Sequence, residues 1–143
     1  MKKISVLMCL MVFVNLIFAQ KDTSYYSPKI IHYSVAEAQN SKEKVIVFLI
    51  RGQNLLIMPN EISDFKDLEM VNLMKNKIEV LSSSVYNLPK LQELNMRENN
   101  LKSIEKGMGK MKELEFLFLE KNQLQEIPQE IKKLKKLESI DLE

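Results

Sequence analysis

Hydrophobic side chains return with a period of 23 residues from Val45 to the end of the chain. Between Leu114 and Lys136, apolar residues stand at positions one, four, six, eleven, fourteen, eighteen and twenty-one of the period, and Asn122 stands at position nine. The three preceding frames repeat this pattern without insertion, which indicates a repeat array. The repeats are therefore placed at 45–67, 68–90, 91–113 and 114–136, with a partial repeat at 137–143.

Positions four and six of each repeat flank one variable residue, as in Leu117-Phe118-Leu119. This alternation predicts a strand of about three to four residues with one face directed inward. The remaining positions form a return segment on the opposite side of the solenoid. This segment leads back to the next strand, which lies parallel to the first and about 4.8 Å away. The predicted class is α/β: a solenoid of short parallel strands, with short helical, 3-10 or irregular segments on the opposite side.

Position nine is the place where each repeat leaves its strand and turns. Asparagine occupies it in three repeats, as Asn76, Asn99 and Asn122, and Gln53 replaces it in the first. A side-chain amide carries both donors and an acceptor, so it can satisfy the backbone groups that the turn exposes to an apolar interior. We predict a structural ladder of these three asparagines.

The first nineteen residues have the order of a secretory signal, because Lys2 and Lys3 precede an uncharged apolar run that ends at Ala19. We expect cleavage at or next to Ala19 and a protein outside the cytoplasm, either secreted or attached to the cell surface. An uncleaved anchor is the alternative, although the apolar run is shorter than the about 20 residues of a spanning helix.

Residues 20–44 are interpreted as a linker followed by an N-terminal capping helix. Ser34 to Glu37 match a capping box, in which the serine bonds a free donor of the first turn and the glutamate reaches back. This predicts a helix from Val35 to Asn40. The terminal unit of a repeat array needs a cover with a polar outer face. The apolar residues expected to lie over the open end of the first repeat are Val35, Ala36 and Ala38.

Charge and residue types limit which kinds of binding or catalytic site this chain can form. Removal of residues 1–19 takes away two lysines and no acid, which leaves 19 basic and 19 acidic residues in a neutral chain. Neutrality argues against nucleic acid, whose binding depends on clustered excess Lys and Arg. Cys9 leaves with the signal, and His32 has no cysteine or acidic partner at ligand spacing. We therefore expect no metal site, no cofactor and no catalytic residue.

The pattern LxxLxLxxNxL followed by [LI]PxxIxxLxx resembles the 23-residue leucine-rich repeat with a Leu-Pro second half. The resemblance covers residues 45–143. The proline is present as Pro59 and Pro128, but Ser82 and Glu105 replace it in the middle repeats. The resemblance implies a curved solenoid whose concave strand face binds another macromolecule, usually a protein.

The binding positions of that family are three, five and seven, which point away from the solenoid interior. In this chain they are Val47, Leu49, Arg51, Met70, Asn72, Met74, Glu93, Asn95, Arg97, Phe116, Phe118, Glu120, Ser139, Asp141 and Glu143. Exposed aromatic residues beside Arg are enriched at the energetic centres of interfaces, so we expect a contact patch here. The expected partner-binding residues are Met70, Asn72, Met74, Asn95, Arg97, Phe116, Phe118 and Glu120. Apolar surface residues without a partner are the alternative interpretation.

Together these patterns predict an exported, non-catalytic protein-protein recognition module that inserts into no membrane after signal cleavage. The alternative is a truncated or self-associating structural array. Leu137, Ile140 and Leu142 of the partial repeat would lie at an open strand edge, which is a template for pairing with another chain. Self-association would then proceed through residues 137–142.

Overall fold

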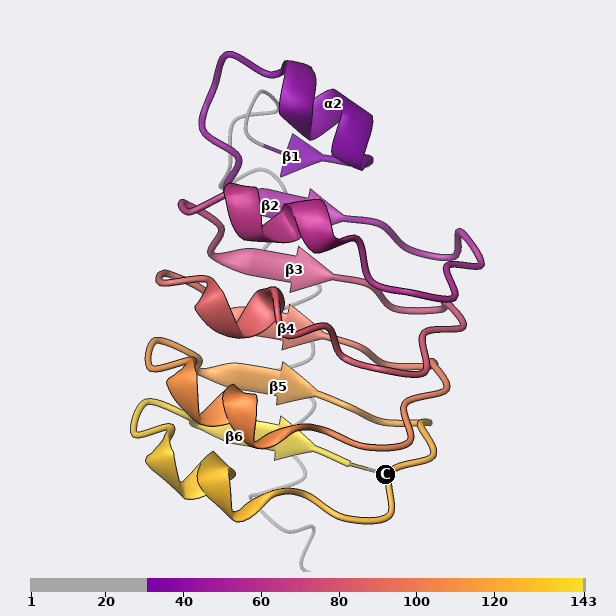
Figure 1. The fold of residues 1–143 in the computed structure, drawn as a ribbon, viewed down its shortest axis with the longest axis vertical. Helices are drawn as coiled ribbons and strands as arrows, with labels where there is room; N and C mark the ends of the chain where they lie inside the picture. The colour runs from indigo at the N-terminus through magenta and orange to yellow at the C-terminus, as the bar shows by residue number, and fades with distance from the viewer. Residues whose placement is uncertain (1–30, 143) are drawn as a thin grey trace, which may run out of the picture.

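The computed structural model describes residues 31–142, in which short strands stack in sequence order into one parallel sheet (Figure 1). The strands are β1 (Ile31–His32), β2 (Val47–Leu49), β3 (Met70–Asn72), β4 (Glu93–Asn95), β5 (Phe116–Phe118) and β6 (Ser139–Asp141). From β2 onward the register advances by one whole repeat at each step, so residues at the same repeat position lie side by side. The predicted fold class is confirmed. The predicted signal peptide at residues 1–19 and the outward position of Glu143 lie outside the described residues.

Strand β1 is a feature that the sequence pattern did not predict. It lies within the segment interpreted as a linker and pairs parallel to β2, with Ile31 opposite Val47 and His32 opposite Phe48. Two residues are too short for a period to be recognised. The pairing directs His32 to the same side as the core residue Phe48, and the histidine is only 4% exposed. It is therefore part of the buried end of the array.

The N-terminal cap follows as α2 (Val35–Asn40), with the bounds that the capping box predicts. The Ser34 hydroxyl accepts a hydrogen bond from the backbone N–H of Glu37 at 3.1 Å, and the Glu37 carboxylate accepts one from the backbone N–H of Tyr33 at 2.8 Å. Ala38 is buried and Val35 packs against the core. Ala36 is exposed, contrary to expectation, because it lies on the solvent side of the helix.

The core runs the length of the array between the sheet and the opposite wall. Inward positions four and six are closed to solvent through the central repeats, with Val71, Leu73, Leu94 and Met96 each 0% exposed. The core ends gradually, because the inward Ile140 of β6 is only half buried. Each repeat therefore depends on its neighbours for burial.

The wall opposite the sheet consists of 3-10 helices, one in each complete repeat (Figure 1). Their bounds are η2 (Asn60–Asp64), η3 (Val85–Asn87), η4 (Lys106–Lys110) and η5 (Gln129–Lys133). Pro59 and Pro128 precede η2 and η5 in extended backbone, and Glu105 takes the same conformation before η4 with φ −77° and ψ 159°. Its backbone N–H donates to the hydroxyl of Tyr86 at 3.3 Å, a bond that proline cannot make.

The asparagines at position nine join each turn to the turn before it. The Nδ2 of Asn99 donates to the carbonyl oxygens of Leu73 and Met96 at 2.9 and 3.0 Å, and its Oδ1 accepts from the N–H of Ile78 at 3.1 Å. Asn76 and Asn122 bond the corresponding groups of their own neighbours. Each amide thus uses donors and acceptor together on backbone groups of two repeats.

In the part of the chain that the structure describes, no helix is long and apolar enough to cross a membrane.

Candidate functional site

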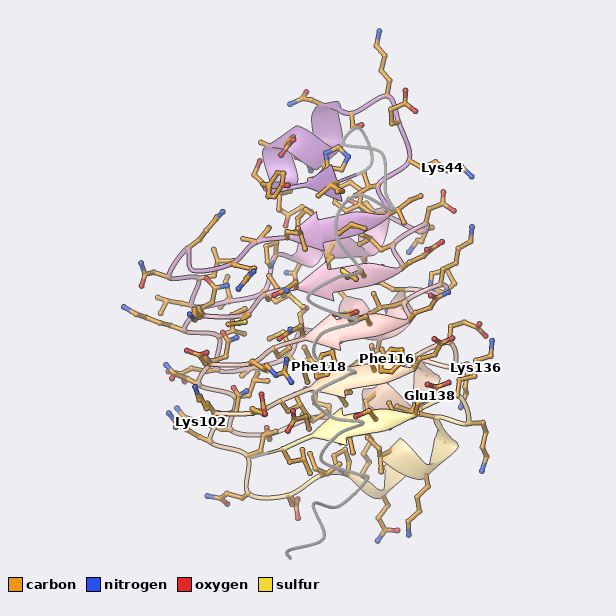
Figure 2. The ribbon with its side chains drawn as sticks, turned by 180° about the vertical axis from the view of Figure 1, so that it is seen from behind. Lys44, Lys102, Phe116, Phe118, Lys136 and Glu138 are labelled. Atoms are coloured by element: carbon orange, nitrogen blue, oxygen red, sulfur yellow. The ribbon has the colours of Figure 1, made fainter. Side chains whose placement is uncertain are left out.

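The side of the sheet that faces away from the core carries repeat positions three, five and seven, and we call it the strand face. Figure 2 shows this face, with Phe116 and Phe118 lying over the strands. Position two borders it, because Ile46 packs with Ile31, Val47, Leu49 and Met70 in a small apolar cluster separate from the main core. The strand face is thus a continuous surface built from every repeat.

Register decides which of the predicted residues are neighbours. Asn72 lies beside Asn95, and Asn95 lies beside Phe118. Met70 and Phe116 are two strands apart, because Glu93 lies between them in the same column. The predicted residues therefore share one face but do not form one apolar patch.

Arg97 contacts three other side chains on this face. Its Nη2 donates to the Asp141 carboxylate at 2.8 Å, and its Nε forms an ion pair with Glu120. The guanidinium carbon lies 4.2 Å from the centroid of the Phe118 ring, in the geometry of a cation–π contact. One cation thus joins three strands, β4 to β6, at the ends where they leave the sheet. We call these four side chains the Arg97 cluster.

The two carboxylates of the Arg97 cluster compete for this single cation. Burial raises the pKa of Glu120 above its usual value, and the adjacent Asp141 raises it further, whereas Arg97 acts in the opposite direction. Asp141 was expected among the outward positions but not among the binding residues. Its role emerges only when β6 is placed beside β5.

A side chain that points outward on this face is not always exposed to solvent. Phe118 is 4% exposed and Asn95 is 6% exposed, so neither is the open contact residue that the sequence suggested. Arg97 stacks on the Phe118 ring, and the Asn95 Oδ1 accepts from the backbone N–H of Arg97 at 3.1 Å. Asn72 makes the same bond to the backbone N–H of Met74 at 3.1 Å. Met70, Met74 and Phe116 remain half-buried.

Lysine does not occur at the outward positions of residues 46–141, whereas both arginines of the chain, Arg51 and Arg97, do. Lysines instead pair with acids one repeat away on the other surfaces. The pairs are Lys90 with Asp67, Lys136 with Glu113, Lys102 with Glu79 at 2.7 Å and Lys121 with Glu98 at 3.7 Å. Figure 2 accordingly shows Lys44, Lys102 and Lys136 at the margins, away from the strands.

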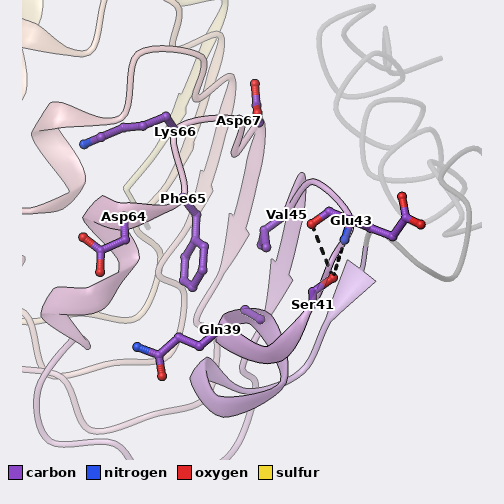
Figure 3. A pocket seen from close by; sticks show the side chains of 9 residues that line it. Gln39, Ser41, Glu43, Val45, Asp64, Phe65, Lys66 and Asp67 are labelled. Carbon is purple, nitrogen blue, oxygen red and sulfur yellow. Dashed lines mark hydrogen bonds between the residues drawn. The ribbon is translucent and has the colours of Figure 1, made fainter.

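A separate groove of about 380 Å³ lies between α2 and η2, with Phe65 and Val45 among its apolar lining (Figure 3). One of its acidic residues, Asp67, is already paired with lysines. Asp67 is shared by Lys44 at 4.0 Å and by Lys90, whose hydrogen bond lowers the pKa of Asp67. Within residues 31–142, no group of three or more His, Cys, Asp or Glu side chains could hold a metal ion.

The family model described as leucine rich repeat matches this chain twice, over residues 66–124 and 89–143. In a comparison of sequences, no curated protein matches the chain.

Solved structures with the same architecture come from bacteria and plants. Internalin C2 of Listeria monocytogenes superposes with a TM-score of 0.64 at 17% identity, over 77% of this chain and 46% of that protein. A plant peptide hormone receptor, RGFR1, solved in complex with RGF2, gives a TM-score of 0.60 at 31% identity over 66% of this chain and 16% of the receptor. The ectodomain of the membrane receptor kinase GASSHO1/SCHENGEN3 from Arabidopsis thaliana, in complex with CASPARIAN STRIP INTEGRITY FACTOR 2, gives 0.57 at 33% identity over 67% and 11%. The chain spans less than half the length of each of these relatives.

Proposed function

The chain belongs to the leucine-rich repeat family, and from that premise we propose that it is an exported, non-catalytic recognition module that binds a protein on its strand face. Domains of this family generally mediate protein binding. Two of the structural relatives are plant receptors that were solved with bound partners. Export is supported by the basic start and apolar run of residues 1–19 and by the extracellular nature of the receptor ectodomain.

The observation that carries this proposal is the sorting of residue types between surfaces. Methionine, phenylalanine and arginine occupy the strand face, and lysine is confined to the other surfaces of residues 46–141. Protein interfaces are enriched in aromatic residues, Met and Arg and depleted in Lys. An ordinary solvated surface in a lysine-rich chain would not need this separation.

The test introduces lysine at two strand-face positions, a residue type that this face lacks. Met70→Lys combined with Phe116→Lys should abolish capture of a partner from the extracellular milieu, because both changes put a hydrated charge in the contact area. Ile57→Lys combined with Val80→Lys is the matched control, since these two apolar residues occupy one repeat position on another surface and are 76% and 57% exposed.

Captured material would be compared by quantitative mass spectrometry, after equal denaturation midpoints have shown that both double variants fold. Loss of a partner with the strand-face variant alone supports the proposal. Equal capture by the parent and the strand-face variant, or loss only with the control, would exclude the strand face as the binding surface.

Self-association through β6 is a second candidate. Among the described residues no strand pairs with the outer edge of β6, Leu137 and Ile140 are half-buried, and Leu142 is 49% exposed. An open strand edge can pair with another copy. Light scattering against concentration separates the candidates: a constant monomer mass excludes self-pairing, whereas dimers that Ile140→Lys abolishes would favour it.

A further inference from the structure

The methionines of the array fall into two groups by their access to solvent. Residues 31–142 contain six methionines and no cysteine. Four of the six lie in the core at 2% exposure or less, and these are Met58, Met96, Met108 and Met111. The other two, Met70 and Met74, are half-buried and belong to the strand face. Within the described residues, sulfur that a dissolved oxidant can reach is therefore confined to the strand face.

Met70 and Met74 lie at the two ends of one strand but have different surroundings. Met70 begins β3 and packs against the apolar side chains of Ile31 and Val47. Met74 follows β3, and its Sδ accepts a hydrogen bond from Nη2 of Arg51 at 3.7 Å. A thioether sulfur is only a weak acceptor. The exposed guanidinium of Arg51 is thus placed beside a sulfur atom to which an oxygen could be added.

The reaction that these two sulfurs can undergo is oxidation to the sulfoxide. With hydrogen peroxide, a sulfur lone pair attacks one oxygen and the O–O bond breaks. The sulfur is oxidised by two electrons and keeps that oxygen, and the other oxygen takes up the remaining proton and leaves as water. The product is a polar, chiral side chain in place of a flexible apolar one. At Met74 the new oxygen can accept the hydrogen bond that Arg51 now donates to the sulfur.

We propose that Met70 and Met74 form an oxidation site, at which peroxides make the β3 part of the strand face polar while the core methionines keep their thioethers. The selectivity follows from exposure alone and is independent of the proposed function. The consequence for binding rests on the proposed function. A sulfoxide in the contact area loses its water to an apolar partner without a matching hydrogen bond, so the oxidised protein releases the partner. Sulfoxide reductases reverse the change.

Peptide mapping by mass spectrometry after treatment with dilute hydrogen peroxide tests the site itself. In the native protein, Met70 and Met74 should become sulfoxides about tenfold faster than the four core methionines, because a buried sulfur reacts only when the structure opens. In guanidinium chloride all six should react at similar rates, which controls for intrinsic reactivity. Similar rates in the native protein, or faster oxidation of a core methionine, would overturn the oxidation site.

Capture from the extracellular milieu tests the effect on binding. Peroxide treatment of the parent should reduce the captured partner about fivefold, and methionine sulfoxide reductases A and B should restore it, because oxidation disrupts interfaces that contain methionine. The matched variant is Met70→Leu combined with Met74→Leu, which removes both sulfurs at similar side-chain volume. The amount that this variant captures should be the same before and after peroxide treatment.

The outcomes separate this proposal from the proposed function. If the Met70→Lys and Phe116→Lys variant loses the partner while the oxidised parent keeps it, the proposed function stands and the effect of oxidation on binding is wrong. If neither change affects capture, the strand face is not the binding surface, and the peptide map alone decides whether the oxidation site exists. A loss that the reductases do not reverse, or that the double leucine variant also shows, would exclude the two sulfurs as its cause.

Discussion

Asn99 shows how much a single buried residue contributes to this fold. Its amide bonds the backbone of two repeats and is 5% exposed. Replacement by alanine leaves these groups without partners in an apolar interior, so Asn99→Ala should lower the free energy of unfolding by about 1–3 kcal/mol. Urea denaturation measures the loss. Asn100→Ala is the control, because the neighbouring half-buried residue bonds Ile78 through its backbone N–H. Equal losses for the two variants would contradict the ladder.

Gly107 is the place where one repeat meets the next without room for a side chain. A Cβ atom there would lie 2.5 Å from Cδ2 and 2.8 Å from Cε2 of the Tyr86 ring. Gly107→Ala should therefore destabilise the protein by about 1–3 kcal/mol through overpacking. Tyr86→Leu in the same chain should relieve much of that cost, which a double-mutant cycle by thermal unfolding would measure. Additive effects would show that the ring is not the obstacle.

At the scale of elements, Glu120 follows β5 and lies beside Asp141 of β6, in surroundings that disfavour the charged form of its carboxyl group. Because burial and Asp141 raise the pKa of Glu120, the folded state holds this proton more tightly than the unfolded state, whose value is near 4.5. Charged Glu120 is therefore a cost at neutral pH. The unfolding free energy of the parent should rise relative to Glu120→Gln as the pH falls from 7 through the raised pKa to 4.5.

Asp67 supplies a control of opposite sign for that experiment. Its pKa is lowered, chiefly by the hydrogen bond from Lys90, so its stabilising contribution is present at neutral pH and is lost as the pH falls through the folded value below 3.8. Urea midpoints of the parent and Asp67→Asn should keep a constant difference from pH 7 to 4.5. A similar profile for Glu120→Gln would contradict the raised pKa.

At the scale of the molecule, the solenoid places its lysines and its arginines on different surfaces. Lysine–acid pairs one repeat apart run along the surfaces away from the sheet, as Lys102 with Glu79 and Lys136 with Glu113 do. Exposed pairs of this kind contribute little stability. The lysines of these pairs lie at repeat positions outside the strand face, whereas Arg51 and Arg97 lie on it. The capture experiment with the paired lysine variants tests this division.

Most of the architecture was predictable because the same pattern of apolar positions recurs in each repeat. The period placed every strand from β2 to β6, and the capping box placed α2. Strand β1 was missed because it is outside the period and only two residues long. The 3-10 helix η4 forms without its proline because Glu105 adopts the same backbone conformation and uses its N–H on Tyr86.

The candidate site was less predictable than the fold. Sequence placed Arg97, Phe118 and Glu120 on one face, but pictured Phe118 as an open aromatic residue. In the structure, Arg97 covers its ring and pairs with Asp141, which is 44 residues away in the chain. Side-chain contacts of this kind depend on rotamers and on which strands are adjacent. A local sequence pattern predicts neither of these.

The sequence by itself determined the repeat, the inward residues, the turn asparagines and the face that each variable position occupies, because burial of apolar side chains imposes a period that can be counted. Only the tertiary structure decided which charges meet. It placed Arg97 of one repeat between the carboxylates of Glu120 and Asp141 from the next two repeats. Hydrophobic burial acts on every repeat alike, whereas electrostatic pairing depends on distances between residues that are remote in sequence.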